Sequence, residues 1–120
     1  MKNLVSSEQN KKEITVQQLH EATTLGQGSF AVIDVRTPEE YLSGAIPTAK
    51  NIPLDNLAQQ AEQLRKYDRV YLVCRSGGRS LLAQVQLELL GLGNSINVKG
   101  GTSAWIDAGY EVKKKKTPYK

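Results

Sequence analysis

The chain has 120 residues, of which 39% are hydrophobic and 23% are charged, with a formal net charge of +4. This length fits one domain with one hydrophobic core, and the composition is typical of a folded globular protein rather than a disordered one. No apolar run approaches the roughly 20 residues that span a bilayer, and the polar start lacks the apolar segment of a signal peptide, so we expect a cytoplasmic protein.

The first third of the chain contains two candidate strands and one candidate helix. Glu13–Ile14 fits a very short strand, and Val16–Thr24 has a helical pattern that we expect to stop at Gly26. Phe30–Val35 is almost continuously apolar, as a strand covered on both faces requires. We therefore predict a buried strand in this last segment.

A helix start signal follows this strand. Thr37 fits the N-cap, Pro38 the first helical position, and Glu40 stands three residues after the cap, which together favour a capping box. Lys50–Ile52 is a candidate short strand, and Leu54–Leu64 has a helical pattern rich in Gln and Ala. We therefore predict a helix, a short strand and a second helix in this part of the chain.

The second half continues the alternation of strands and helices. Val70–Cys74 is another continuous apolar run, Ser95–Val98 is a weaker strand candidate, and Thr102–Asp107 fits a short helix. The longest predicted helix runs from about Arg79 to Leu90, and one of its faces carries Leu82, Val85 and Leu89. Strands that alternate with helices predict an α/β fold built on a parallel sheet.

The chain has one cysteine, Cys74, and one histidine, His20. A single cysteine forms neither an intrachain disulfide nor a CxxC pair, and it cannot build a zinc site of four cysteines, so we expect no metal and no cofactor. Cys74 is therefore either a buried structural thiol or a single reactive one. His20 lies in a predicted helix far from Cys74 in sequence, and we interpret it as structural rather than as a catalytic base.

The segment after the second buried strand favours a reactive cysteine. Cys74 ends a strand of a parallel sheet, where ligands bind, and the next turn leads into a helix N-terminus, whose free N–H groups and dipole stabilise an anion. Two glycines let backbone N–H groups turn toward the sulfur, and two arginines add positive charge. These features favour the thiolate, which is the nucleophile. The candidate site is Cys74 with Arg75, Ser76, Gly77, Gly78, Arg79 and Ser80.

Four consecutive lysines, Lys113–Lys116, account for the whole net charge. Such a run is able to bind nucleic acid or anionic lipid, but it has no interleaved aromatic residues and no accompanying motif. We interpret it as a solvated tail and expect neither a nucleic acid nor a membrane as partner. The predicted organisation is a flexible N-terminal segment (residues 1–12), one domain (13–112) and a lysine-rich tail (113–120).

Four segments of the chain resemble the rhodanese family, in family order and over about Ile14 to Tyr110. They are Val32–Tyr41, Gly44–Pro47 with Asn51–Pro53, Cys74–Ser80, and Gly100–Trp105 with Ala108–Tyr110. The third segment is the most specific of the four. The resemblance implies an α/β fold with a central five-stranded, mainly parallel sheet and helices on both faces.

The resemblance also implies a reaction. Cys74 would take the outer sulfur of thiosulfate or another sulfane donor as a persulfide, and cyanide, a thiol or a protein acceptor would remove it. By the same resemblance, the loop amides from Arg75 to Arg79 cradle the persulfide, Arg75 meets the incoming anion, and Arg79 braces the loop. We expect the protein to act as a monomer.

The resemblance also concerns four positions outside the Cys74 loop, none of which it implies to be catalytic. Asp34 and Arg36 would be mainly structural and tie the first segment near the site, and Trp105 would be a core or pocket-wall residue. The chain departs from the family at Ala45, where members often have histidine. We expect this to affect stability or partner contacts rather than the reaction.

Three other functions remain open. A cysteine phosphatase or arsenate reductase also sets a thiolate and an arginine on an anion-binding loop, but that loop has five residues between them, whereas four separate Cys74 from Arg79 here. A regulatory module would keep the fold without the chemistry, although inactive versions would be expected to lack the cysteine. A sulfur-relay carrier would use the same chemistry with another protein's persulfide, and the sequence does not separate it from a thiosulfate enzyme.

Overall fold

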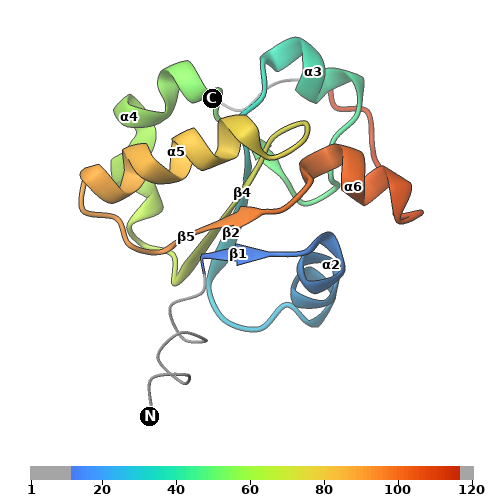
Figure 1. Ribbon diagram of the computed structural model, residues 1–120, viewed down its shortest axis with the longest axis horizontal. Helices are drawn as coiled ribbons and strands as arrows, with labels where there is room; N and C mark the ends of the chain where they lie inside the picture. The colour runs from blue at the N-terminus through green and yellow to red at the C-terminus, as the bar shows by residue number, and fades with distance from the viewer. Residues whose placement is uncertain (1–11, 117–120) are drawn as a thin grey trace.

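The structure, a computed structural model, describes residues 12–116, so the predicted segment 1–12 lies outside it except for Lys12 (Figure 1). Within the described range the chain forms an α/β fold around a five-stranded, all-parallel sheet in the order β1-β5-β4-β2-β3. This confirms the predicted fold class. The strands are β1 (Glu13–Ile14), β2 (Phe30–Asp34), β3 (Lys50–Asn51), β4 (Arg69–Val73) and β5 (Ser95–Val98).

The longest strand pairing joins β2 and β4 in the middle of the sheet, from Phe30 opposite Arg69 to Asp34 opposite Val73. Successive side chains of these strands point to opposite faces, and both faces are covered, so nearly every position needs an apolar residue. Cys74 follows the last residue of β4. The sulfur is therefore held at the carboxyl end of the most central part of the sheet.

Helices cover both faces of the sheet, and each face has its own core. On one face α2 (Val16–Leu25), α3 (Pro38–Ser43) and α6 (Gly101–Asp107) contribute Leu19, Tyr41 and Trp105 to the core. On the other face α4 (Leu57–Gln60) and α5 (Gly78–Leu89) pack with Leu57 and Leu87 against Leu72 and Cys74. Figure 1 shows α4 and α5 on one side of the sheet and α2 on the other.

The predicted helix start after β2 is confirmed in detail. The Thr37 hydroxyl accepts a hydrogen bond from the Glu40 N–H at 3.3 Å, and the Glu40 carboxylate accepts one from the Thr37 N–H at 3.1 Å. Pro38 is the first residue of α3. The helix α2 likewise begins after a capping Thr15 and ends at Gly26, whose φ of 62° suits a glycine.

The predicted helical segment over Leu54–Leu64 is helical along its length, but it is not one α-helix. The segment divides into a 3-10 turn (Leu54–Asn56), α4, and a second 3-10 turn (Ala61–Leu64). The backbone N–H of Leu54 bonds to the Val35 carbonyl, which ties the first turn to the end of β2. Tertiary contacts of this kind override a weak helical pattern in a short segment.

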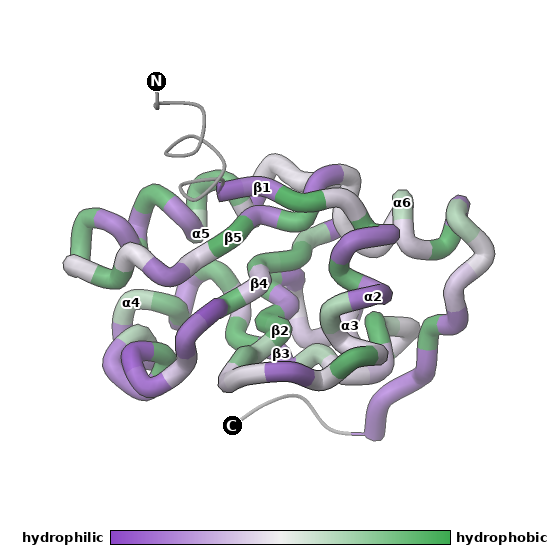
Figure 2. Tube along the Cα trace, turned by 90° about the horizontal axis from the view of Figure 1, so that it is seen from below, coloured by the Kyte–Doolittle hydropathy of each residue, from purple (hydrophilic) through white to green (hydrophobic). Residues whose placement is uncertain are grey.

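The predicted apolar face of the longest helix is also not the buried one. Leu82, Val85 and Leu89 are 58%, 53% and 83% exposed. The buried face of α5 instead carries Ser80, Ala83, Gln84 and Leu87. The Gln84 amide donates to the carbonyl groups of Ser95 and Lys12, at 3.2 and 2.9 Å. Polar contacts with the sheet therefore fix the rotation of this helix. Figure 2 shows hydrophobic and hydrophilic residues alternating along α5.

The lysine run is attached to the domain in its described part. Lys113 forms an antiparallel bridge with Ala45, with hydrogen bonds of 2.9 and 2.8 Å, and the Lys115 N–H bonds to the Leu42 carbonyl. The Lys115 ammonium donates to the Pro47 carbonyl at 2.8 Å. Ala45 itself is fully buried, so its small side chain lies under this segment. None of the helices within residues 12–116 is long and apolar enough to cross a membrane.

Candidate active site

The Cys74 sulfur is enclosed by the turn that follows it. The residue is 1% exposed and belongs to the core beneath α5. Its sulfur accepts a hydrogen bond from the Gly77 N–H at 3.0 Å, and the Ser80 hydroxyl lies 3.4 Å away. The loop therefore turns hydrogen-bond donors toward the sulfur.

The two glycines of this loop have different roles, although the sequence assigned one role to both. Gly77 has a φ of +113°, which an L-residue rarely adopts, and this conformation directs its N–H to the sulfur. Gly78 is the first residue of α5 and has no positive φ, and a Cβ there would meet nothing within 4 Å. Only Gly77 is required by the geometry.

The N-terminus of α6 supports the loop from the other side, a contact that was not predicted from the sequence. The backbone N–H groups of Thr102 and Ser103 bond to the carbonyls of Cys74 and Arg75, both at 2.9 Å. A Cβ on Gly101 would lie 2.2 Å from the Cys74 carbonyl oxygen. The sequence does carry one signal for this contact. The pair Gly100 and Gly101 stands at the start of α6, a helix without a capping side chain.

The local hydrogen bonds favour the thiolate. Burial raises the pKa of the Cys74 thiol, but hydrogen bonds from the Ser80 hydroxyl and from the N–H groups of Ser80, Gly77 and Ser76 outweigh it, so the pKa lies below that of an ordinary cysteine. From the sequence, part of this effect was expected to come from the flanking arginines. The leading contributions come from the loop amides and the hydroxyl.

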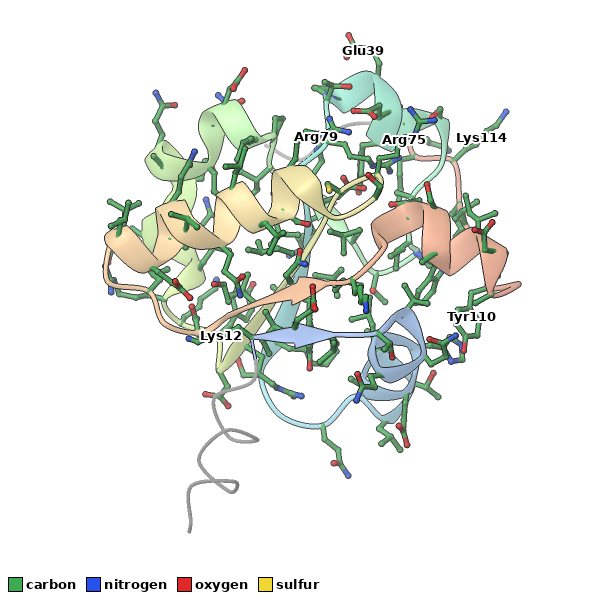
Figure 3. The ribbon with its side chains drawn as sticks, viewed as in Figure 1. Lys12, Glu39, Arg75, Arg79, Tyr110 and Lys114 are labelled. Atoms are coloured by element: carbon green, nitrogen blue, oxygen red, sulfur yellow. The ribbon has the colours of Figure 1, made fainter. Side chains whose placement is uncertain are left out.

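The two arginines occupy different settings. Arg75 is exposed, and its side chain has no hydrogen bond or ion pair with any described residue. Arg79 forms two hydrogen bonds with the Glu40 carboxylate, Nη1–Oε1 at 2.7 Å and Nη2–Oε2 at 3.0 Å. Figure 3 shows both arginines at the end of the sheet that carries Cys74. Arg75 is thus available to a ligand, whereas Arg79 is held by α3.

Asp34 and Arg36 form a buried ion pair at the end of β2. The Arg36 guanidinium bonds to the Asp34 carboxylate at 2.7 to 3.1 Å and to the Gly44 carbonyl at 2.8 Å. The Val35 N–H bonds to the Val73 carbonyl at 2.8 Å. The pair therefore fixes the backbone beside the strand that carries Cys74, and its charges are matched internally.

His20 and Trp105 lie on the other side of the sheet from the thiol. His20 stacks on Tyr110 at a ring separation of 4.1 Å and lies 5.6 Å from the Trp105 ring. Trp105 belongs to the core of the α2 and α6 face, whereas Cys74 belongs to the α4 and α5 face. Neither side chain is part of the sulfur site.

A cavity of about 280 Å³ opens beside Arg79, between the start of α3 and the turn after β3. Its lining is mixed, with apolar side chains from Val35 and Leu54 and polar groups from Asp55 and Asn56. A small molecule held near Arg79 would therefore meet both apolar and hydrogen-bonding surface.

Comparisons with known proteins agree on one family. The model of the rhodanese-like domain matches residues 15–108. "Thiosulfate sulfurtransferase 18" of Arabidopsis thaliana is 31% identical over 126 residues and is covered to 93%, as is this chain. YrkF of Bacillus subtilis, which is named as a sulfur carrier protein, is 36% identical over 77 residues. These residues make up 64% of this chain and 42% of YrkF. The crystal structure of a rhodanese-like domain protein from Staphylococcus aureus has a TM-score of 0.76 and 36% identity, covering 88% of this chain and 99% of that one.

Proposed function

Because the chain belongs to the family of rhodanese-like domains, we propose that it transfers sulfane sulfur through a persulfide on Cys74. The observation that carries this proposal is the ring of donors around a buried sulfur, with the Gly77 N–H at 3.0 Å. A ring that lowers the pKa of the thiol also stabilises the thiolate when it leaves in the second step.

The reaction balances with thiosulfate as donor. The Cys74 thiolate attacks the outer sulfur of thiosulfate and forms a new S–S bond. The S–S bond of thiosulfate breaks, and its electron pair leaves with sulfite. An acceptor, such as cyanide or a thiolate, then attacks the outer sulfur of the persulfide, and the Cys74 thiolate leaves with the electron pair of the broken bond. No metal or redox cofactor enters either step.

The two arginines of the loop have different roles in this proposal. The exposed Arg75 stands next to Cys74 without a partner of its own among the described side chains, so its charge is available to the dianionic donor. The paired Arg79 holds the loop against α3 through Glu40. This pairing also argues against a phosphatase, in which the arginine has to face the bound phosphate.

A sulfur carrier that exchanges persulfide sulfur with another protein is the second candidate. One observation favours it: the relative YrkF is named as a sulfur carrier. The chemistry at Cys74 is the same in both cases, so the two functions differ only in the donor and the acceptor. Thiosulfate turnover separates them, because a dedicated carrier takes sulfur from a persulfide much faster than from thiosulfate.

Intact-protein mass spectrometry tests the proposal. Incubation with thiosulfate should add the mass of one sulfur atom, and cyanide or a thiol should remove it. The Cys74→Ser variant should show no adduct and should keep its fold, which thermal unfolding checks. Absence of the adduct with both thiosulfate and a low-molecular-weight persulfide, while Cys74 remains reactive to iodoacetamide, would contradict the proposal.

A further inference from the structure

The Ser80 hydroxyl has one proton and three acceptors around it. Its oxygen lies 3.4 Å from the Cys74 sulfur, 3.1 Å from the Gly77 carbonyl and 2.5 Å from the Asn97 amide oxygen. Ser80 is fully buried, so water does not compete. The Asn97 amide oxygen only accepts hydrogen bonds, so the Ser80 hydroxyl is the donor in this contact. The hydroxyl has a single proton, so the Asn97 oxygen and the Cys74 sulfur compete for it.

Glu13 fixes the orientation of the Asn97 amide. The Asn97 Nδ2 group donates to the Glu13 carboxylate at 3.1 Å, across the register pair that joins β1 to β5. An ionised carboxylate only accepts hydrogen bonds, so the amide has to present nitrogen to Glu13 and oxygen to Ser80. Asn97 is 1% exposed, and this arrangement uses both ends of its amide.

We propose that Asn97, oriented by Glu13, is a positioning residue that controls whether the Ser80 hydroxyl donates to the Cys74 sulfur. The proposal rests on the proposed function only for its role in the reaction. In the persulfide, the Cys74 sulfur is uncharged and a weak acceptor, so the Ser80 proton stays on the Asn97 side. When the acceptor removes the outer sulfur, a thiolate forms, and the hydroxyl turns to donate to it.

This turn needs only rotation of the Ser80 hydroxyl hydrogen, because both acceptors are already in place. The Asn97 oxygen competes with the thiolate for one proton, and it therefore limits how far Ser80 stabilises the thiolate. Removing that competitor should lower the pKa of Cys74, and removing Ser80 itself should raise it. A merely structural Asn97 would change stability without moving the pKa in this pattern.

The pH dependence of Cys74 alkylation by iodoacetamide provides the test, and it needs no sulfur donor. Relative to the unchanged protein, Asn97→Ala should lower the apparent pKa by about 0.5 to 1 pH unit, and Ser80→Ala should raise it. The double variant should match Ser80→Ala alone, because Asn97 acts through the hydroxyl. A shift from Asn97→Ala that persists in the Ser80→Ala background, or a rise instead of a fall, would overturn the proposal.

Glu13→Gln provides a second variant that leaves the buried residues intact. The new amide both donates and accepts, so it no longer forces the Asn97 nitrogen toward position 13. Part of the Asn97 amides should then turn and present nitrogen to Ser80, and the pKa of Cys74 should fall, by less than in Asn97→Ala; an unchanged pKa would refute the role of Glu13. This shift should vanish in the Ser80→Ala background, whereas an effect of charge alone would remain there and refute the role of Glu13. Glu21→Gln, which removes an exposed carboxylate on α2, is the matched control and should give no shift.

All other charged groups around the sulfur are the same in every variant, so the comparison isolates the hydroxyl. These groups are Arg75, Arg79 with Glu40, and the Asp34–Arg36 pair. Thermal unfolding of each variant checks the fold. Alkylation curves remain interpretable even if no persulfide forms with thiosulfate, so failure of this proposal and failure of the proposed function are separate results.

Discussion

Arg79 and Glu40 form a two-point ion pair that joins the loop after Cys74 to the first turn of α3. The same carboxylate completes the capping box with Thr37. One side chain thus links the start of a helix to the position of the loop that follows Cys74. The sequence assigned Glu40 to the cap and Arg79 to the loop, but the two residues are 39 positions apart, and the sequence did not pair them.

The first prediction concerns the acid stability of this pair. The Arg79 hydrogen bonds hold the pKa of Glu40 at about 2, against 4.5 for an ordinary glutamate, although partial burial acts in the opposite direction. Because the folded-state pKa is lowered, the ionised carboxylate adds to the free energy of unfolding. This contribution is complete above about pH 4.5 and is lost as the pH falls toward 2. Urea unfolding of Glu40→Gln at neutral pH should show a loss of about 1 kcal/mol, because the pair is partly exposed.

The difference between Glu40→Gln and the unchanged protein should shrink below about pH 4.5 and vanish near pH 2. Glu39→Gln is the matched control, because Glu39 is the neighbouring glutamate and Figure 3 shows its side chain pointing away from the domain. An equal loss in the control, or a loss independent of pH, would show that the ion pair is not its cause.

The second prediction contrasts two glycines near the sulfur. Gly101→Ala places a Cβ 2.2 Å from the Cys74 carbonyl oxygen at a φ of +56°, so the loop has to move. The strained backbone alone costs about 1 to 3 kcal/mol, and the clash adds to it. Gly78→Ala places its Cβ in open space at the start of a helix and should not lower stability. Denaturant unfolding measures both, and equal losses would contradict the close approach of α6 to the loop.

Much of the fold follows from the sequence because its strongest signals are local. The capping residues of α3 act within one turn, and the apolar runs of β2 and β4 reflect burial on both faces. The candidate site was proposed for the same reason, since Cys74 and its loop are contiguous in sequence. Gly101 and Asn97 were not assigned, because their contacts with this loop depend on how β5 and α6 pack.

The rotation of α5 was predicted wrongly for a different reason. Leucine and valine occur on several sides of this helix, so the period of its apolar residues does not select one face. The choice is made by Ser80 and Gln84, whose buried polar groups find partners only when they face the sheet. A polar residue with a specific partner thus decided the packing where apolar residues did not.

The third prediction tests this rotation with one substitution at two positions. Leu87 is fully buried against the sheet, whereas Leu89 is 83% exposed. Leu87→Ala should lower the free energy of unfolding by about 2 to 5 kcal/mol, because it leaves a cavity. Leu89→Ala should change it by less than about 0.5 kcal/mol. Chemical denaturation measures both values. A larger loss of unfolding free energy at Leu89 than at Leu87 would show that the face predicted from the sequence is the buried one.

The last prediction concerns Arg75 as the residue that meets the donor. Its side chain is exposed and has no ion pair within residues 12–116, so replacing it removes no internal contact. Arg75→Gln should therefore leave thermal stability nearly unchanged. It should raise the KM for thiosulfate by about 10-fold or more, which is the loss of one hydrogen bond to a charged group. Arg75→Lys should recover part of this loss, because the charge remains while the two-point geometry does not.

Lys114→Gln separates local binding from the general field of the surface. Figure 3 places Lys114 at the same end of the protein as Arg75, and it is likewise exposed. Screening by salt weakens distant exposed charges, so its removal should change the KM by less than about 2-fold at physiological ionic strength. Steady-state kinetics on the three variants give the comparison. An unchanged KM with a reduced kcat in Arg75→Gln would assign Arg75 to the loop structure, and equal effects at Arg75 and Lys114 would assign both to long-range steering.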